Sequence, residues 1–301
     1  MNWWKRLYSI ACLSQKRDLR SKAGKPNLSG MDIKVIDAKG ESLGAYLRAV
    51  VANRHLMRTL ALRDLKIRYA QTSLGLLWTV LKPLTGLAIF YVFFGLLVKV
   101  DTGDIPYPLF AFAGLSAWYF FAFLVSACGT SLMSAQDIIR YIYFPKLILP
   151  LSKVLAGLVE FSVNLLIMFF MLIWYGYWPG WSILALPLVI LLNAFLGFTI
   201  GLWFSALTIR RRDFQHVIPY MLNVGMWVSP VFYPSTMIPQ AYDFVLYANP
   251  IAGTLAGYRW ALLGAEIPSV LYLISLIPLL ILFVGGFWYF RKVEREMTDL
   301  V

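Results

Sequence analysis

The 301-residue chain contains few of the residues on which redox, metal and hydrolytic chemistry depend. Its two cysteines, Cys12 and Cys128, are too few for a disulfide framework or a cysteine-based metal site. Its two histidines, His55 and His216, form no pair at metal-ligand spacing. No Gly-rich segment ends in Lys followed by Ser or Thr, so the chain lacks a phosphate-binding loop for ATP. We therefore predict neither a metal site nor a cofactor in this chain.

Charged residues are also scarce. They make up 14% of the chain, whereas 60% is hydrophobic and the mean hydropathy is +0.69. In soluble domains about a quarter of the residues are charged, so much of this chain needs lipid as its solvent. The remaining charge is lopsided, because 27 Lys and Arg against 15 Asp and Glu leave a net charge of +12. In a membrane protein this excess marks cytoplasmic segments, and we predict no nucleic-acid partner.

Six apolar segments reach or approach the length of about 20 residues that a helix needs to cross a membrane. They are residues 76–98, 105–128, 154–175, 181–207, 217–232 and 268–290. The fifth is short and contains Pro219 and Pro230, so we expect a short or broken helix there that continues as irregular chain. Basic residues concentrate in alternate connections, which places both termini in the cytoplasm. The sequence thus predicts an all-α integral membrane protein with six transmembrane helices and cytoplasmic N- and C-termini.

Two apolar segments outside the spans are also predicted to be helical. From Leu43 to Leu60, apolar residues recur every three, four or seven positions with arginines between them, which predicts an amphipathic helix. Such a helix lies along the cytoplasmic headgroup surface or packs on a partner subunit. Residues 233–268 are too apolar for a solvated loop. We expect short helices at 241–247 and 251–263 that re-enter the outer leaflet before the sixth span.

These features divide the chain into four parts. Residues 1–42 form a polar, basic extension that we expect to be cytoplasmic, with a composition compatible with flexibility. Residues 43–75 hold the amphipathic interface helix and the segment that leads into the first span. Residues 76–290 form the six-helix transmembrane domain, and residues 291–301 form a cytoplasmic tail.

A series of ordered motifs identifies a family. The first runs from Leu62 to Trp78 and reads LRDLKIRYAQTSLGLLW, with Lys82-Pro83-Leu84 shortly after it. The later motifs are FPKLILP at 144–150, RDF at 212–214, SPVFYP at 229–234, and Asn249-Pro250 followed by Arg259. This series resembles the permease subunit of ABC-2 type exporters that move lipid-linked polysaccharides, the O-antigen, capsule and teichoic-acid group. It covers about residues 45 to 295, and the first 40 or so residues match nothing in the family core.

The resemblance implies a transport subunit and not an enzyme. Two copies would form a channel in the bacterial inner membrane for a polyprenyl-pyrophosphate-linked polysaccharide, in the first place O-antigen. Each copy would dock a separate cytoplasmic ATPase subunit, which would bind the ATP and Mg. The loop after the second span, Ser134–Pro145, matches the coupling helix that inserts into the ATPase, with Gln136, Asp137, Arg140 and Tyr141 as coupling residues. An ordinary positive-inside loop has a similar composition.

Three groups of residues are candidates for contact with a lipid-linked glycan. Basic residues ahead of the first span suit a pyrophosphate, since Arg offers two parallel donors, although topology alone also places basic residues there. Glu160 and Asn164 share one face of the third span, where the acid either hydrogen-bonds to a passing sugar or pairs with another helix. Aromatic residues near the middle of the second span either line a channel or simply pack. The candidates are Arg63, Lys66, Arg68 and Tyr69 at the headgroup, Trp118, Tyr119, Phe120, Glu160 and Asn164 in the channel, and Pro230, Tyr233, Pro234, Asn249, Pro250 and Arg259 at an exit gate.

The sequence leaves some choices open. Arg259 either meets lipid phosphates or pairs with an acid. An integral-membrane glycosyl- or acyltransferase acting on polyprenyl-linked glycans is the alternative function, but it needs a converging catalytic carboxylate or His, and none is evident. A secondary carrier should show internal repeats or several charges in mid-membrane, whereas Glu160 stands alone there.

Overall fold

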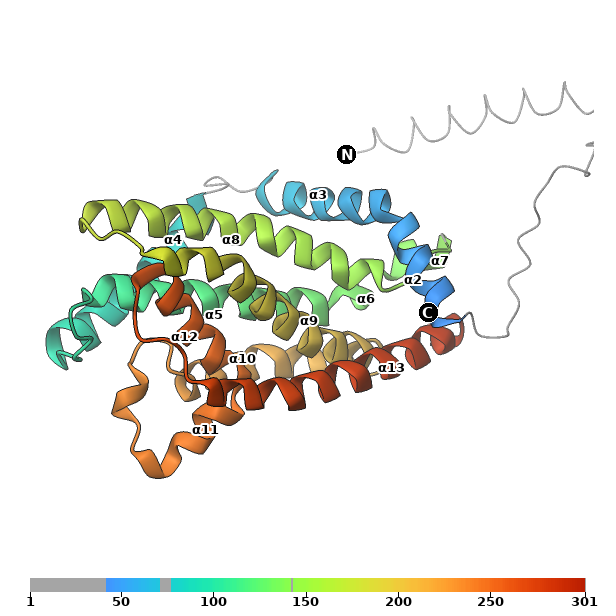
Figure 1. The fold of residues 1–301 in the computed structure, drawn as a ribbon. Helices are drawn as coiled ribbons and strands as arrows, with labels where there is room; N and C mark the ends of the chain where they lie inside the picture. Colours follow the sequence, from blue (N-terminus) through green and yellow to red (C-terminus); the bar gives the residue numbers. More distant parts are fainter. Residues whose placement is uncertain (1–41, 71–76, 142, 301) are drawn as a thin grey trace, which may run out of the picture. The chain divides into compact units, whose positions relative to one another are not determined.

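A computed structural model of the chain describes residues 42–70, 77–141 and 143–300, with backbone only for residues 69, 70, 240 and 298–300 (Figure 1). Throughout these ranges the chain forms helices and no strands, so the predicted all-α class is confirmed. The residues from Leu43 onward form one compact unit. The predicted extension, residues 1–42, lies outside the described residues except for Ser42.

Five helical segments are long and apolar enough to cross a membrane, and each overlaps one predicted span. They are Leu77–Leu97 (α4, Leu77–Phe90, continued by the π-helix η2, Tyr91–Leu97), α5 (Tyr107–Gly129), α8 (Ile148–Trp174), Trp181–Arg210 (η3, Trp181–Ala185, and α9, Leu186–Arg210) and Val270–Met297 (η6, Val270–Ser275, and most of α13, Leu276–Leu300). The predicted fifth span, 217–232, overlaps α10, Phe214–Val228, which is only 15 residues long and runs through Pro219 without a break. Such a helix rises about 22 Å and falls short of a core about 30 Å thick. The sixth crossing therefore stays a prediction.

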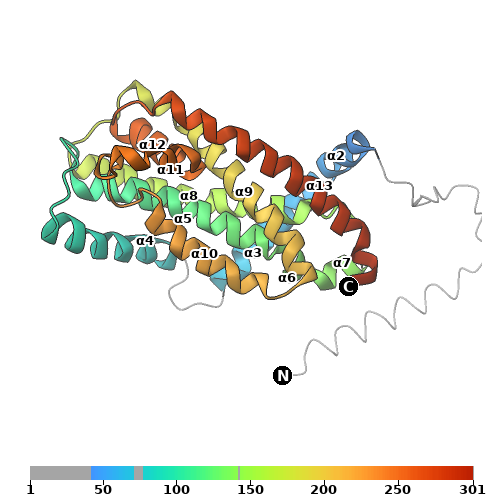
Figure 2. The same cartoon turned by 90° about the horizontal axis from the view of Figure 1, so that it is seen from below.

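Helix α5 is the centre of the bundle. Figures 1 and 2 show α5, α8, α9 and α13 running side by side along its length, and α5 contacts both α8 and α9. Of the most apolar stretch of α5, 78% of the residues are buried, against 11% for Leu77–Leu97. Gly197 and Gly201 of α9 allow the close approach to α5, because a Cβ atom at either position would lie within 2.8 Å of Leu124 or Cys128. This spacing of small residues is typical of tightly packed membrane helices.

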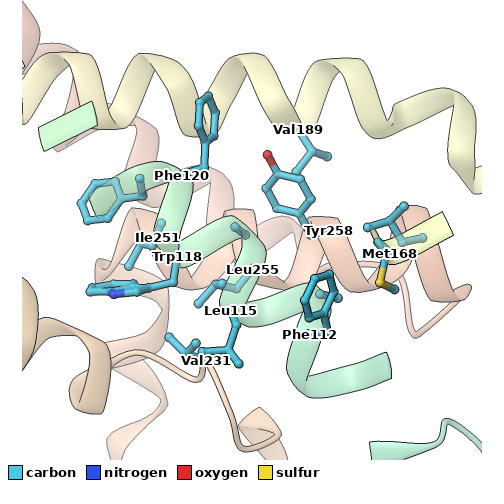
Figure 3. Close-up of a cluster of buried hydrophobic side chains, with 14 of the residues drawn as sticks. Phe112, Leu115, Trp118, Phe120, Met168, Val189, Val231, Ile251, Leu255 and Tyr258 are labelled. Atoms are coloured by element: carbon cyan, nitrogen blue, oxygen red, sulfur yellow. The ribbon is translucent and has the colours of Figure 1, made fainter. Parts of the chain in front are cut away.

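Two clusters of buried side chains hold the bundle together. The larger surrounds α5 and includes Phe112, Leu115 and Trp118, which Figure 3 shows beside Val231 and Leu255. The smaller lies at the end where α2 (Leu43–Ala52), α6 (Ser131–Ser134), α7 (Gln136–Tyr141) and the end of α13 gather. The opposite end of the bundle carries α11 (Asp243–Ala248), α12 (Pro250–Leu263) and the short 3-10 turns η4 (Ser235–Met237) and η5 (Gln240–Tyr242).

The single amphipathic helix predicted over Leu43–Leu60 is two helices, α2 and α3 (Arg54–Ala70), so that prediction was wrong in extent. The break lies at Asn53, whose side-chain amide donates to the Ala49 carbonyl at 2.8 Å and so competes with regular helical bonding. Val50 and Leu60 are buried in the smaller cluster, so part of the apolar face packs on the chain itself. Helix α3 then lies along α8 (Figure 1).

The end of the last helix differs from the prediction, whereas two short helices before it agree with the prediction. Helix α13 runs without interruption from Leu276 to Leu300, so the predicted tail, residues 291–301, continues the last helix for almost its whole length. The two short helices predicted at 241–247 and 251–263 are α11 and α12. Their position relative to a membrane stays a prediction.

Candidate functional site

A cavity of about 390 Å³ lies between the end of α3, the start of α4 and the middle of α5 and α8. Its walls combine cationic, aromatic and amide side chains. They are Arg68, Trp78, Thr79, Lys82, Pro83, Tyr119, Phe120, Phe123, Gly157, Glu160, Phe161 and Asn164. The cavity therefore brings together residues that the sequence suggested for two separate tasks, one at the headgroup and one in the channel.

An ion pair between Arg68 and Glu160 forms one wall of the cavity. Nη1 of Arg68 lies 2.6 Å from Oε1 of Glu160, and the carboxylate side chain is only 16% exposed. Two turns earlier on α8, Nζ of Lys153 lies 2.5 Å from Oδ2 of Asp64, and this ion pair fixes the register of α3 against α8. Glu160 is twelve residues beyond the start of α8 at Ile148, or about 18 Å along the helix. The arginine thus neutralises an acid deep in an otherwise apolar helix.

Two cations lie over aromatic rings of α5 at the cavity. The guanidinium carbon of Arg68 is 4.7 Å from the ring centre of Phe123, and Nζ of Lys82 is 5.7 Å from that of Tyr119. A ring face attracts a cation because the quadrupole of the ring is negative there. The rings therefore hold both positive charges at the cavity wall. Gly86 leaves room for Tyr119, whose hydroxyl would lie 2.5 Å from a Cβ atom at that position.

Asn164 lies one helical turn beyond Glu160 on the same face of α8 and also lines the cavity. Its side chain is 8% exposed, and its Oδ1 has no hydrogen-bond partner among the residues that the structure describes. Leaving a buried carbonyl oxygen without a donor costs about 1–3 kcal/mol. A ligand hydroxyl or amide in the cavity would remove that cost.

The other headgroup and channel candidates lie elsewhere. Arg63 pairs with the neighbouring Asp64 at 3.0 Å, and Lys66 is exposed outside the cavity lining. The side chain of Tyr69 lies outside the described residues. Trp118 is buried in the core against Phe121, with its ring centre 5.3 Å away.

Sequence reasoning missed several cavity residues. Lys82 and Trp78 belong to the first family motif, and that membership was the available signal. Phe123 is one of many aromatic residues in the second span and gave no signal of its own.

Three of the six exit-gate candidates, Pro230, Tyr233 and Pro234, lie in residues 229–234, the segment after α10, and Asn249 and Arg259 contact this segment. Asn249 caps α12 by accepting from the Ile251 amide, and its Nδ2 donates to Ser229 at 3.0 Å. The hydroxyl of Tyr233 donates to the Trp227 carbonyl at 3.2 Å. Pro230 is buried in the segment, and Pro250 follows the cap at the start of α12. Pro234 ends the segment and precedes η4.

Arg259 has neither of the partners expected from the sequence within the described part of the chain. It is 6% exposed, and its Nη2 donates to the Val231 carbonyl at 2.7 Å. Its guanidinium carbon lies 3.7 Å from the ring centre of Phe110 on α5. Tyr107 of α5 donates to the Phe232 carbonyl at 3.0 Å. Side chains from α5 and α12 therefore fasten the segment 229–234 by its backbone.

The coupling candidates lie on α7, at the end of the bundle opposite α12 (Figures 1 and 2). Asp137, Arg140 and Tyr141 are exposed, Tyr141 to 87%, while Gln136 is half-buried. The intervening apolar residues Ile138 and Ile139 pack on the smaller cluster. A short helix is thus anchored on one side and presents polar and aromatic groups on the other.

After α7 the chain returns to the bundle through Lys146. Its side chain is 8% exposed, and Nζ lies 4.5 Å from the ring centre of Phe144. Burial lowers the pKa of this ammonium group below its usual range.

Comparison with known proteins identifies the family of this chain. The model of the ABC-2 type transporter family matches residues 55–263, and the chain belongs to this family. It is similar to the O-antigen export system permease protein RfbA of Myxococcus xanthus, with 29% identity over 76% of this chain and 88% of that protein. An RfbA of Klebsiella pneumoniae is 28% identical over 79% and 92% of the two chains. The polysialic acid transport protein KpsM of Escherichia coli is 25% identical over 81% and 95%. The family predicted from the motifs is thereby confirmed.

Proposed function

We propose that this chain is the membrane-spanning permease subunit of an ATP-driven exporter for a lipid-linked polysaccharide, in the first place O-antigen. It belongs to the ABC-2 family, and the relatives are named as permeases for O-antigen and polysialic acid. The chain supplies a path through the bacterial inner membrane. ATP and Mg are bound by a separate ATPase subunit, and the function of this chain is transport without bond cleavage. The observation that carries the proposal is the cavity with the Arg68–Glu160 pair in its wall.

The cavity suits the phosphorylated end of a lipid-linked glycan. Its volume of about 390 Å³ lies at the lower end of the range of about 300–1,000 Å³ for small-ligand pockets, so it holds one phosphorylated sugar and not a polymer. Arg68 and Lys82 supply positive charge for phosphate, and Asn164 offers an acceptor for a sugar hydroxyl. A phosphate binds Arg68 in the geometry that a carboxylate uses, and so competes with Glu160 for it.

The connectivity of the bundle supports a sixth crossing. Tyr46 of α2 and Glu294 of α13 are hydrogen-bonded at 2.8 Å, so the first and last helices meet at one end. Arg210, at the end of α9, pairs with Glu296 and lies at that same end. Arg259 of α12 contacts Phe110 near the start of α5, at the opposite end. Helix α10, together with segment 229–234, is what joins the two ends, and we propose it as the fifth of six crossings.

The same geometry supports cytoplasmic termini and a second copy. The basic segments and α7 lie at the end where α2 and α13 meet, which is the cytoplasmic end by the positive-inside rule. Helices α11 and α12 then re-enter the outer leaflet. The apolar stretches of Leu77–Leu97 and Val270–Met297 are only 11% and 17% buried. Lipid and a second copy of the chain in a homodimer cover these surfaces.

The test of the cavity uses the permease and its ATPase subunit reconstituted in vesicles with a lipid-linked glycan. We expect Arg68→Ala to reduce export at least about tenfold, since it removes a charge-assisted hydrogen-bond donor for phosphate. Arg58→Ala is the matched control, because Arg58 is exposed on the same helix and lies outside the cavity. If the Arg68→Ala variant exported glycan at the wild-type rate, at equal protein abundance, a substrate role for the cavity would be contradicted.

A further inference from the structure

A buried group of polar residues joins three elements at the end of the bundle that carries α7. Glu294 of α13 is 12% exposed and uses both carboxylate oxygens. Its Oε1 accepts from the Lys146 amide at 2.7 Å, and its Oε2 accepts from the Tyr46 hydroxyl at 2.8 Å. The same Tyr46 hydroxyl accepts from the Leu147 amide at 3.3 Å. Arg291 lies 3.5 Å above the Tyr46 ring and 3.5 Å from Oε2 of Glu294.

The two amides held in this way are those of consecutive residues at the start of α8. Leu147 is the N-cap residue of α8, and no side chain of its own caps this helix. Amides at a helix N-terminus have no partner within the helix, and the helix dipole favours a negative charge there. Glu294 provides that charge from another helix. Tyr46 brings α2 into the same contact.

The location of this group gives it a mechanical consequence. Only Ile142, Tyr143, Phe144 and Pro145 separate the end of α7 at Tyr141 from Lys146. A displacement of α7 therefore reaches the start of α8 through a very short connection. Because Glu294 ties that point to α2 and α13, the three helices cannot move apart there without exposing or unpairing a buried carboxylate, which is strongly unfavourable.

We infer that Glu294 is a positioning residue for energy coupling, which makes the cytoplasmic ends of α2, α8 and α13 move as one body when an ATPase subunit displaces α7. This inference rests on the proposed function, since it presupposes an ATPase partner at α7. Glu294 itself contacts neither the cavity nor the exposed face of α7. It acts through the amides of residues 146 and 147 and through Tyr46.

The chain offers a matched control two residues further on. Glu296 lies on the same helix and pairs with Arg210, but its side chain is 42% exposed. An exposed pair of this kind contributes little to stability. Removing Glu296 changes the charge of α13 by the same amount as removing Glu294, and it leaves the contact between α2, α8 and α13 intact.

The experiment measures ATP hydrolysis and glycan export in parallel in vesicles that contain the complete permease and ATPase. We expect Glu294→Ala to lower the glycan exported per ATP at least about fivefold, within the range by which substitutions along a coupling path act. Glu294→Gln should retain most of the wild-type ratio, because its amide oxygen accepts from Lys146 and its NH₂ group donates to Tyr46. Glu296→Ala should match the wild type.

If the Glu294→Ala variant exported as much glycan per ATP as the wild type, the inference would be overturned. If that variant does not accumulate, Tyr46→Phe replaces it, since this substitution removes the hydroxyl bonds and keeps the ring beneath Arg291. We expect Tyr46→Phe to lower the ratio and to speed hydrogen exchange at the Leu147 amide, and an unchanged ratio would also overturn the inference. ATP-independent export by the wild type would refute the proposed function itself, which is a distinguishable outcome.

Discussion

Gly114 provides the sharpest test of how the segment 229–234 is held. It lies on α5 beneath this segment, and an added Cβ atom would be 2.1 Å from the Val231 carbonyl oxygen and 2.8 Å from Nη2 of Arg259. The approach to the Val231 carbonyl is not possible without movement of the backbone, and the guanidinium group of Arg259 must shift as well. We therefore predict that Gly114→Ala breaks the hydrogen bond from Arg259 to Val231.

The expected cost follows from two contributions. Loss of a hydrogen bond from a charged donor destabilises by about 1.5–3 kcal/mol, and forcing a methyl group into a packed core costs about 1–3 kcal/mol. The sum of roughly 2.5–6 kcal/mol corresponds to a fall of about 5–24 °C in the unfolding midpoint, at about 2–4 °C per kcal/mol for a unit of this size. Thermal unfolding of the detergent-solubilised protein measures this change.

The control for Gly114→Ala is Gly44→Ala in α2. No atom lies within 4 Å of a Cβ at Gly44, and alanine favours a helix over glycine, so we expect equal or higher stability. If Gly114→Ala unfolds at the wild-type temperature, the close contact between α5 and the segment 229–234 does not exist as described.

Two further predictions concern the cavity and α7. Glu160→Gln removes the carboxylate that competes with phosphate for Arg68, so the KM for the lipid-linked substrate should fall by a few-fold; a higher KM in an export assay would show that Glu160 itself binds the substrate. Tyr141→Ala should leave the unfolding temperature unchanged, because the side chain is 87% exposed, and should weaken the stimulation of ATP hydrolysis by the permease. Unchanged stimulation at saturating permease would remove Tyr141 from the coupling surface.

The long apolar helices were predictable because their signal is local. An apolar run of about 20 residues with at most one charge has few alternatives to a membrane helix, and all five long spans fall on such runs. The short helices α11 and α12 were predictable for a related reason, since Pro and Gly interrupt an apolar stretch at their ends. The prolines of the fifth segment led to the prediction of a short or broken helix. Helix α10 is short, but it runs through Pro219 without a break and ends at Val228, before Pro230. Its length was not enough to confirm a crossing.

The contacts between distant residues were not predictable from one sequence. The pairs Arg68–Glu160 and Lys153–Asp64 exist because α3 lies along α8, whereas an amphipathic pattern is equally consistent with a helix on the headgroup surface. The sequence indicated that Glu160 could pair with another helix, but it did not identify α3 as that helix. Arg259 was expected to meet a phosphate or an acid. Its acceptor is instead a backbone carbonyl, and such a partner cannot be recognised from the sequence. Lys82 was recognised only as part of a family motif, because its place over the ring of Tyr119 depends on how α4 packs on α5.

The measurement that tests the account most directly is ATP-dependent translocation by purified components. The wild-type chain is co-expressed with the ATPase subunit that accompanies it, purified as a complex and reconstituted in vesicles that contain a polyprenyl-pyrophosphate-linked glycan. The account predicts that the two proteins co-purify and that the glycan crosses the membrane only when ATP is hydrolysed. A wild-type chain that binds no ATPase subunit, or a glycan that stays in its original leaflet during ATP hydrolysis, would contradict it.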